Sequence, residues 1–100
     1  MSDPAAGLLF SALADGNRRA IVERIADRGP ATATGLAQEL SISRQGAAKH
    51  LSALAEAGIL DAQRRGREVR FAMVDGSLEA GSRWLERVGG QWDTSRSPDG

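Results

Sequence analysis

The chain has 100 residues, 41% of them hydrophobic, and its 13 basic and 13 acidic side chains give a formal net charge of zero. This length predicts one small domain with a modest core, and the absence of cysteine excludes disulfides and thiolate metal sites and fits a reducing compartment such as the cytoplasm. The N-terminus has neither the basic start of a signal peptide nor an apolar run long enough for a membrane span, so we expect neither.

Two helices are expected before residue 30. Pro4 suits the first turn of a helix whose apolar residues recur at helical spacing until about Asp15-Gly16. Asn17 can cap a second helix, and Gly29-Pro30 stops it.

A third and a fourth helix follow around a tight turn. Thr32 or Thr34 can cap the third helix, and 41–43 is the turn. Ser43 caps the fourth helix, which Gly58 ends at a left-handed position. Two short helices joined in this way are typical of a helix-turn-helix.

The fourth helix has two unlike faces. Ala47, Leu51 and Leu54 step by four and three, so we expect them to point inward. The opposite face is short, polar and uncluttered, and it begins at the helix N-terminus with Ser43, Arg44, Gln45, Ala48, Lys49 and Ser52. In a helix-turn-helix this is the face presented to DNA.

A hairpin and a last helix complete the chain. One strand runs from Ile59 to about Arg64, Gly66 permits the turn, and a return strand alternates between core and solvent. The inward positions of the return strand are Val69, Phe71 and Met73. A last helix starts at Asp75 or Ser77.

The element order is therefore α-α-α-α-β-β-α, a mainly α fold with a small β-hairpin, which is a winged helix-turn-helix. We expect a single domain over 1–100, ordered over about 5–93, with a frayed tail at 94–100.

Positive charge gathers where this fold would meet DNA. Residues 41–70 hold six Lys or Arg against three acidic residues, a charge of +3, and the remainder of the chain carries −3. Arg64, Arg65 and Arg67 crowd the hairpin tip, where phosphates or an A·T-rich minor groove would relieve their mutual repulsion. The alternative is an ordinary solvated turn.

Arg44 and Gln45 are the expected base readers, because Arg can donate two hydrogen bonds to guanine and Gln can form two with adenine. Lys49 and Ser52 are expected to contact phosphate, and Ser43 is a cap first. The alternative is that Arg44 and Gln45 only solubilise an exposed helix start.

The first and last helices together present more apolar surface than a small domain can easily cover, which predicts an interface. We expect a two-fold dimer through Leu9, Phe10, Leu13, Trp84, Leu85, Val88 and Trp92. Such a dimer would place two reading helices about 34 Å apart on a near-palindromic site.

His50 is the single histidine of the chain. One histidine cannot build a metal site within a chain. We expect a packed side chain bonded to backbone; a pH switch or a phosphate contact is the alternative.

Four strings resemble the ArsR family of bacterial winged-helix repressors and together span roughly residues 8 to 93: "LADGNRRAIVERI", "GLAQELSISRQGAAKHLSALAEAGIL", "RRGREVRF" and "WLERVGGQWD". Metal-sensing members carry cysteines on the third helix or Asp/His sets on the last helix. No position here matches either set, so the resemblance implies a branch without a metal site or cofactor.

These patterns predict a sequence-specific DNA-binding regulator, most simply a homodimeric repressor of a promoter, acting through helix 43–57 and wing 64–67. The runner-up is a winged-helix protein-interaction module without DNA binding, against which the basic tip argues. Nothing converges as a nucleophile and base, so we expect no enzyme. The release signal, the operator and the target genes are not readable from the residues.

Overall fold

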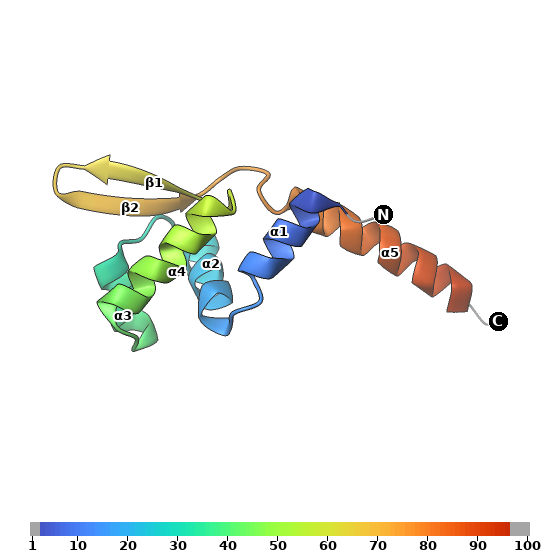
Figure 1. Cartoon of the computed structure of the whole chain (residues 1–100), viewed down its shortest axis with the longest axis horizontal. Coiled ribbons are helices and arrows are strands. Elements are labelled where there is room, and N and C mark those ends of the chain that lie inside the picture. Colours follow the sequence, from blue (N-terminus) through green and yellow to red (C-terminus); the bar gives the residue numbers. More distant parts are fainter. Residues whose placement is uncertain (1–2, 97–100) are drawn as a thin grey trace.

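The computed structural model describes residues 3–96, with side chains described through residue 92. Its elements follow the predicted order: α1 (Pro4–Ala12), α2 (Gly16–Arg28), α3 (Ala33–Leu40), α4 (Arg44–Glu56), β1 (Leu60–Arg65), β2 (Glu68–Met73) and α5 (Glu79–Arg96). Figure 1 shows α2, α3 and α4 gathered beside the hairpin, while α1 and α5 extend away from them. The molecule is elongated as a result and measures 59 × 23 × 21 Å.

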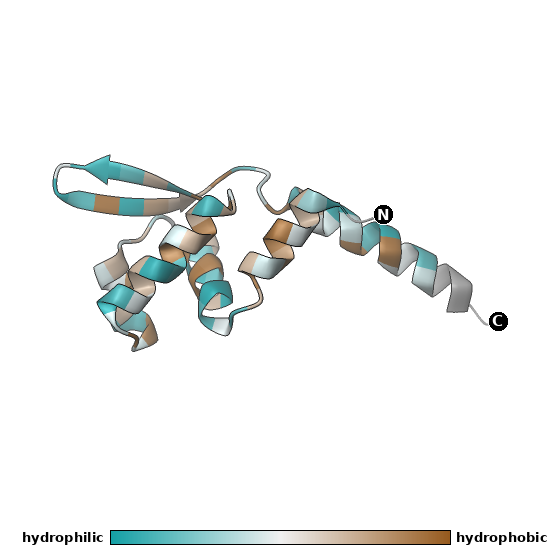
Figure 2. Cartoon of the chain, viewed as in Figure 1, coloured by the Kyte–Doolittle hydropathy of each residue, from teal (hydrophilic) through white to brown (hydrophobic). Residues whose placement is uncertain are grey.

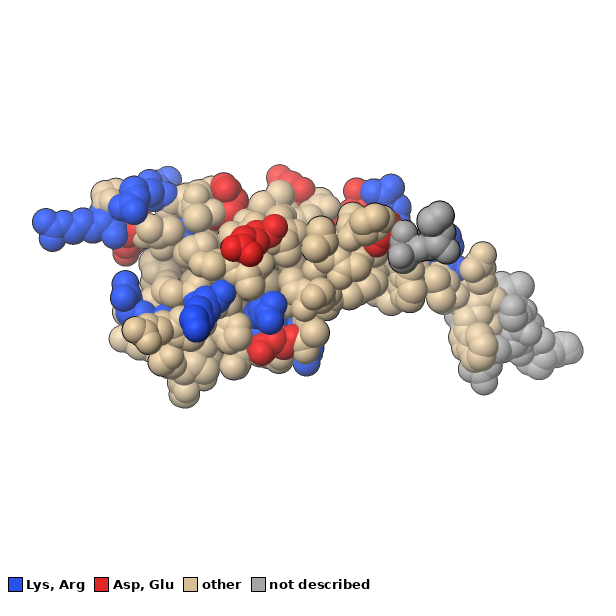
Figure 3. Space-filling model, viewed as in Figure 1, with Lys and Arg blue, Asp and Glu red and all other residues tan. Residues whose placement is uncertain are grey.

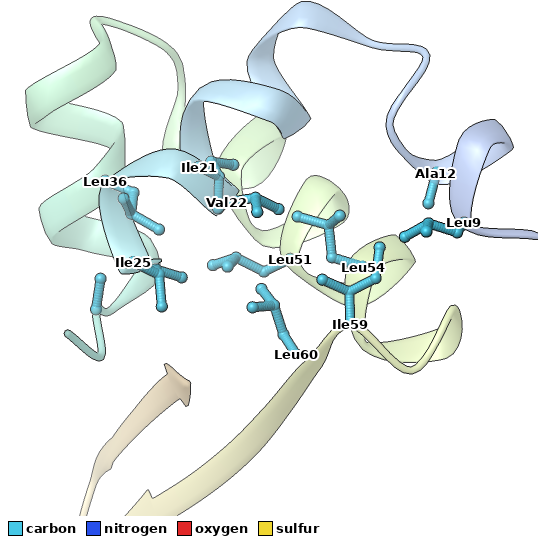
Figure 4. Packing of buried hydrophobic residues seen from close by; sticks show 11 residues of the cluster. Leu9, Ala12, Ile21, Val22, Ile25, Leu36, Leu51, Leu54, Ile59 and Leu60 are labelled. Carbon is cyan, nitrogen blue, oxygen red and sulfur yellow. The ribbon is translucent and has the colours of Figure 1, made fainter. Parts of the chain in front are cut away.

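The core lies between α2, α3, α4 and the start of β1 (Figure 4). Ala47, Leu51 and Leu54 are fully buried, which confirms the predicted inward face of α4. The apolar stripe of α2 meets them through Ile21 and Ile25. Burial of one such side chain contributes about 1.5–3 kcal/mol, so this contact fixes the orientation of α4.

An ion pair joins the outer surfaces of α2 and α3. Arg24 donates from Nε to Glu39 Oε1 at 2.8 Å, and Arg28 lies 3.7 Å from the same oxygen. The hydrogen bond from Arg24 lowers the pKa of the Glu39 carboxyl.

The beginning of α2 differs from the prediction. Asp15, and not Asn17, is the N-cap: its Oδ1 accepts from the N–H groups of Asn17 at 2.7 Å and Arg18 at 3.1 Å. Because α1 already ends at Ala12, Asp15 is free to adopt the extended backbone that a cap requires. Its carboxylate also suits the positive end of the helix dipole better than an amide.

The caps of the helix-turn-helix follow the prediction more closely. Thr32, rather than Thr34, caps α3 by accepting from the N–H of Gly35 at 3.0 Å. Ser43 caps α4 by accepting from the N–H of Gly46 at 2.9 Å, as predicted. Ser41 ends α3 in a left-handed conformation with φ 56°, and Gly58 follows α4 with φ 80°.

The hairpin is antiparallel, with Leu60 paired to Met73 and Arg65 to Glu68 around Gly66. Figure 2 shows the alternation of apolar and polar residues along β2. Phe71 and Met73 pack against the core as expected. Phe71 also exchanges two backbone hydrogen bonds with Ala31, of 2.8 and 3.1 Å, which attach the hairpin to the segment before α3.

Helix α5 begins at Glu79, later than the predicted start at Asp75 or Ser77. Residues 75–78 form a turn instead, in which the Ser77 hydroxyl donates to the Ile59 carbonyl at 3.3 Å and holds the chain beside the start of β1. The helix is described to Arg96, three residues beyond the expected limit of the ordered part. The rest of the tail expected to fray, 97–100, lies outside the described residues.

Helix α5 packs against α1 through its first turns. A Cβ atom added at Gly81 would collide with the Leu9 side chain, so this glycine lets the two helices approach. Phe10 and Trp84 meet edge to face, with ring centroids 5.5 Å apart at 72°. Leu9 is 5% exposed in this contact.

Candidate nucleic-acid interface

The outward face of α4 is solvent-exposed along its whole predicted length. Its members Ser43, Arg44, Gln45, Ala48, Lys49 and Ser52 are all exposed. Gly46, between them, has a structural reason: an added Cβ would lie 3.0 Å from the capping Ser43 hydroxyl. The glycine therefore keeps the first turn open around its cap.

The hairpin tip carries exposed arginines that the described ion pairs do not use. Arg64, Arg65 and Arg67 are all exposed on either side of Gly66. Of the arginines of the hairpin, Arg70 donates to Glu68 at 3.0 Å, and no described ion pair includes the other three. Glu68, the acidic residue beside them, is paired with Arg70, so three cations this close together favour an anionic partner.

A groove of about 690 Å³ joins α3, α4 and the hairpin. Its walls are the start of α3 (Thr32–Gly35), the outward face of α4 (Arg44, Ala48 and Ser52) and the hairpin (Arg67–Val69 and Phe71). Four of the predicted site residues are brought together there. Gln45 and Lys49 are exposed on the same helix but do not line the groove.

The start of α3 is the part of this surface that the sequence interpretation missed. Thr34 accepts a hydrogen bond from Arg44 Nε at 3.0 Å, across the turn between the two helices. The available signal was the pair Thr32 and Thr34: one helix needs a single capping hydroxyl, so the second is left for another partner.

The charge distribution matches this surface. Figure 3 shows Lys and Arg side chains over the hairpin and the α3–α4 end of the molecule. The first turn of α4 contains no acidic residue, and Arg44 is its first residue. A cation at a helix N-terminus is unfavourable by about 0.3–1 kcal/mol, and an anion nearby would offset that.

His50 lies on α4 beside Asp15, and its partner is this carboxylate and not the backbone group that was expected. Its Nε2 is 4.0 Å from Asp15 Oδ1, and its side chain is 22% exposed. The expectation of a backbone partner is therefore wrong: the N-cap of α2 brings a carboxylate to this position. When His50 is protonated, the two side chains form an ion pair between α2 and α4.

Replacement of Asp15 by asparagine should flatten the acid limb of the stability profile. Hydrogen bonds from the N–H groups of Arg18 and Asn17, with the charges of His50 and Arg18, lower the pKa of the Asp15 carboxyl in the folded chain. This carboxylate therefore stabilises the fold above its ordinary pKa, and the contribution is lost as the pH falls through the folded value. Thermal melting from pH 6 to pH 3 should show a smaller fall for Asp15→Asn than for the wild type; equal slopes would contradict the assignment. Asp61→Asn, at an exposed strand position, is the control.

The apolar residues of α1 and α5 divide into buried and exposed sets. Leu9 was predicted to be available at the dimer interface, but α5 already covers it within the chain. Leu13 is half-buried against the core, and Trp84 and Val88 are also half-buried. The exposed set on these helices consists of Phe10, Leu85 and Trp92, which were predicted, at 36, 57 and 58%, and Leu8, which was not, at 62%; Leu78, in the turn before α5, is also exposed at 37%.

The described residues contain no group of three or more His, Asp or Glu side chains placed to hold a metal ion. None of the helices described has the length and apolar character that a bilayer crossing requires.

Comparison with known proteins gives matches that include the helix-turn-helix. A family model described as a helix-turn-helix domain matches residues 13–62. An uncharacterised HTH-type transcriptional regulator of Bacillus subtilis, YuzN, is 38% identical over 65 residues, which are 59% of this chain and 71% of that protein.

Solved structures extend the likeness to nearly the whole chain. An ArsR-like transcriptional regulator from Rhodococcus sp. RHA1 is 35% identical with a TM-score of 0.78, over 94% of this chain and 88% of that one. The homodimeric winged helix-turn-helix DNA-binding domain of a possible ArsR-family regulator from Mycobacterium bovis is 23% identical. Its TM-score is 0.66, over 93% of this chain and 88% of that one.

Proposed function

The chain belongs to the ArsR-like family of winged helix-turn-helix transcriptional regulators, which are not enzymes, and from this premise we propose that it is a homodimeric repressor that binds a near-palindromic operator. We also propose that residues 1–100 act as one domain and that the protein works in the cytoplasm.

One observation carries the DNA-binding part of the proposal. One groove is lined both by Arg44, Ala48 and Ser52 of the exposed α4 face and by Arg67 of the hairpin tip, next to the exposed Arg64 and Arg65. A recognition helix and a basic wing must meet the same duplex, and separate surfaces could not do so.

The roles follow from the chemistry of each side chain. Arg44 and Gln45, in the first turn of α4, read base edges in the major groove. Lys49 and Ser52 bind phosphate further along the helix, with Ala48 allowing close approach between them. Arg64, Arg65 and Arg67 bind the backbone or the minor groove beside it.

Binding to the DNA upstream of the gene should weaken steeply with salt. Lys49 and the three tip arginines give about eight phosphate contacts in a dimer. The logarithm of the binding constant should therefore fall with the logarithm of the salt concentration, with a slope no steeper than about −7. A fluorescence anisotropy titration between about 50 and 300 mM salt measures this slope. No binding, or binding that salt does not change, would overturn the proposal.

The homodimer is supported by the apolar surface of α1 and α5. Leu85 and Trp92 are more than half exposed and Phe10 is 36% exposed, on two helices that pack against each other, whereas α5 makes no extensive contact with α2, α3 or α4. The M. bovis domain of the same fold is homodimeric. Pairing through this face with two-fold symmetry would set two α4 helices about 34 Å apart on one side of the duplex.

Repression follows from occupancy: a dimer on an operator that overlaps a promoter blocks polymerase. The alternative, a protein-interaction module without DNA binding, predicts that the three tip arginines can be replaced without changing DNA affinity. The same anisotropy assay with Arg64, Arg65 and Arg67 changed to glutamine decides between the two functions.

A further inference from the structure

We propose that Thr34 is a positioning residue that orients Arg44 and thereby sets how this protein reads a guanine; the inference rests on the proposed function. The hydroxyl of Thr34 accepts from Arg44 Nε at 3.0 Å. The two residues belong to different helices, so the bond spans the turn of the helix-turn-helix.

The Thr34 hydroxyl is available for this role because α3 does not need it. The N-cap of α3 is Thr32, whose Oγ1 accepts from the N–H of Gly35 at 3.0 Å. Thr34 is the second residue of the helix and is exposed. Thr34 is a poorer helix former than alanine there, so its own helix gains nothing from it.

The hydrogen bond restricts the Arg44 guanidinium to one orientation. A guanidinium is planar and has five N–H donors, of which Nε carries one. With the Nε donor bound to Thr34, four donors remain on the two terminal nitrogens. Those two nitrogens form the fork that matches O6 and N7 of guanine, so Arg44 must approach the base end-on.

The position of both residues in the groove supports the positioning role of Thr34. Thr34 and Arg44 both line the groove that runs between α3, α4 and the hairpin. An arginine held in its binding geometry before DNA arrives loses less side-chain freedom on binding. The effect falls on recognition of the correct base, because contacts to phosphate carry no sequence information whatever the orientation of the guanidinium.

The test compares Thr34→Val, which removes the hydroxyl at nearly the same volume, with Thr34→Ser, which retains it. The probes are a duplex that the wild type selects from a random pool, the same duplex with one guanine pair replaced, and random-sequence DNA. Thr34→Val should lower the preference for the selected duplex by about fivefold and leave affinity for random DNA unchanged. Thr34→Ser should behave as the wild type.

The double variant separates positioning from direct contact. When Arg44 is already alanine, Thr34→Val should cause no further loss of preference. Additive losses, or an equal loss on random DNA, would show that Thr34 contacts the DNA itself and would overturn the proposal.

A measurement on the free protein distinguishes this proposal from the proposed function. The ¹⁵Nε–¹Hε group of Arg44 should be ordered in the wild type and Thr34→Ser, and mobile in Thr34→Val, by heteronuclear NOE. A mobile Nε–H in the wild type overturns the positioning role whether or not DNA binds. Failure of the wild type to select any duplex overturns the proposed function instead.

Discussion

Replacement of Arg44 by alanine should remove most of the base preference of this protein while leaving a folded chain that still binds DNA. Arg44 is exposed and its one described hydrogen bond is to Thr34, so the core does not depend on it. Loss of a bidentate contact to guanine costs about 1–3 kcal/mol, which is roughly a 5- to 150-fold loss of discrimination. Competition between selected and random duplexes measures it.

Lys49→Ala is the matched control, because it removes one exposed positive charge from the same helix face. It should weaken binding to all sequences alike and reduce the magnitude of the salt slope by about one per protomer. If Arg44→Ala weakened selected and random DNA equally, Arg44 would be a phosphate contact and the assignment of base reading would be wrong.

Leu85→Glu should convert the protein into a monomer. Leu85 is 57% exposed on α5, so a charged side chain is tolerated in the free chain, but pairing would bury that charge without a partner. A monomer loses the linkage between two half-sites, which is worth about 10²–10⁴-fold in affinity. Sedimentation equilibrium at micromolar concentration and anisotropy on the selected duplex report the two effects.

Glu86→Gln, at the neighbouring exposed position of α5, is the control and should leave both measurements unchanged. A wild type that sediments as a monomer under the same conditions would count against the dimer, and a dimeric Leu85→Glu would place the contact elsewhere.

Periodicity predicted those parts of the fold in which one residue interacts with its own helix or strand. The inward positions Ala47, Leu51 and Leu54, the cap Ser43 and the alternation along β2 all follow from local geometry. The α2 cap was missed because Asp15 and Asn17 are both good caps, and the choice depends on where α1 ends. A decision of that kind is made by packing and not by propensity.

The missed features of the site are contacts between elements. Leu9 was predicted to lie in the dimer interface, and its burial within the chain depends on Gly81, which is 72 residues away and lets α5 approach. The bond between Thr34 and Arg44 joins two helices across a turn, and no spacing rule within one helix predicts it. Both cases need the relative placement of elements, which a pattern of apolar and polar residues does not contain.

The attachment of the hairpin has a consequence for how firmly DNA is held. The two bonds between Phe71 and Ala31 fix only the base of the hairpin, and an isolated two-stranded ribbon is marginally stable in water. Conformational freedom therefore increases from Phe71 towards Gly66, and ordering of the tip arginines is a cost met on each binding event. In the proposed complex the wing would therefore add reach more than affinity: it would follow duplexes of different groove width, while the helix pair behind it would keep the register on the bases.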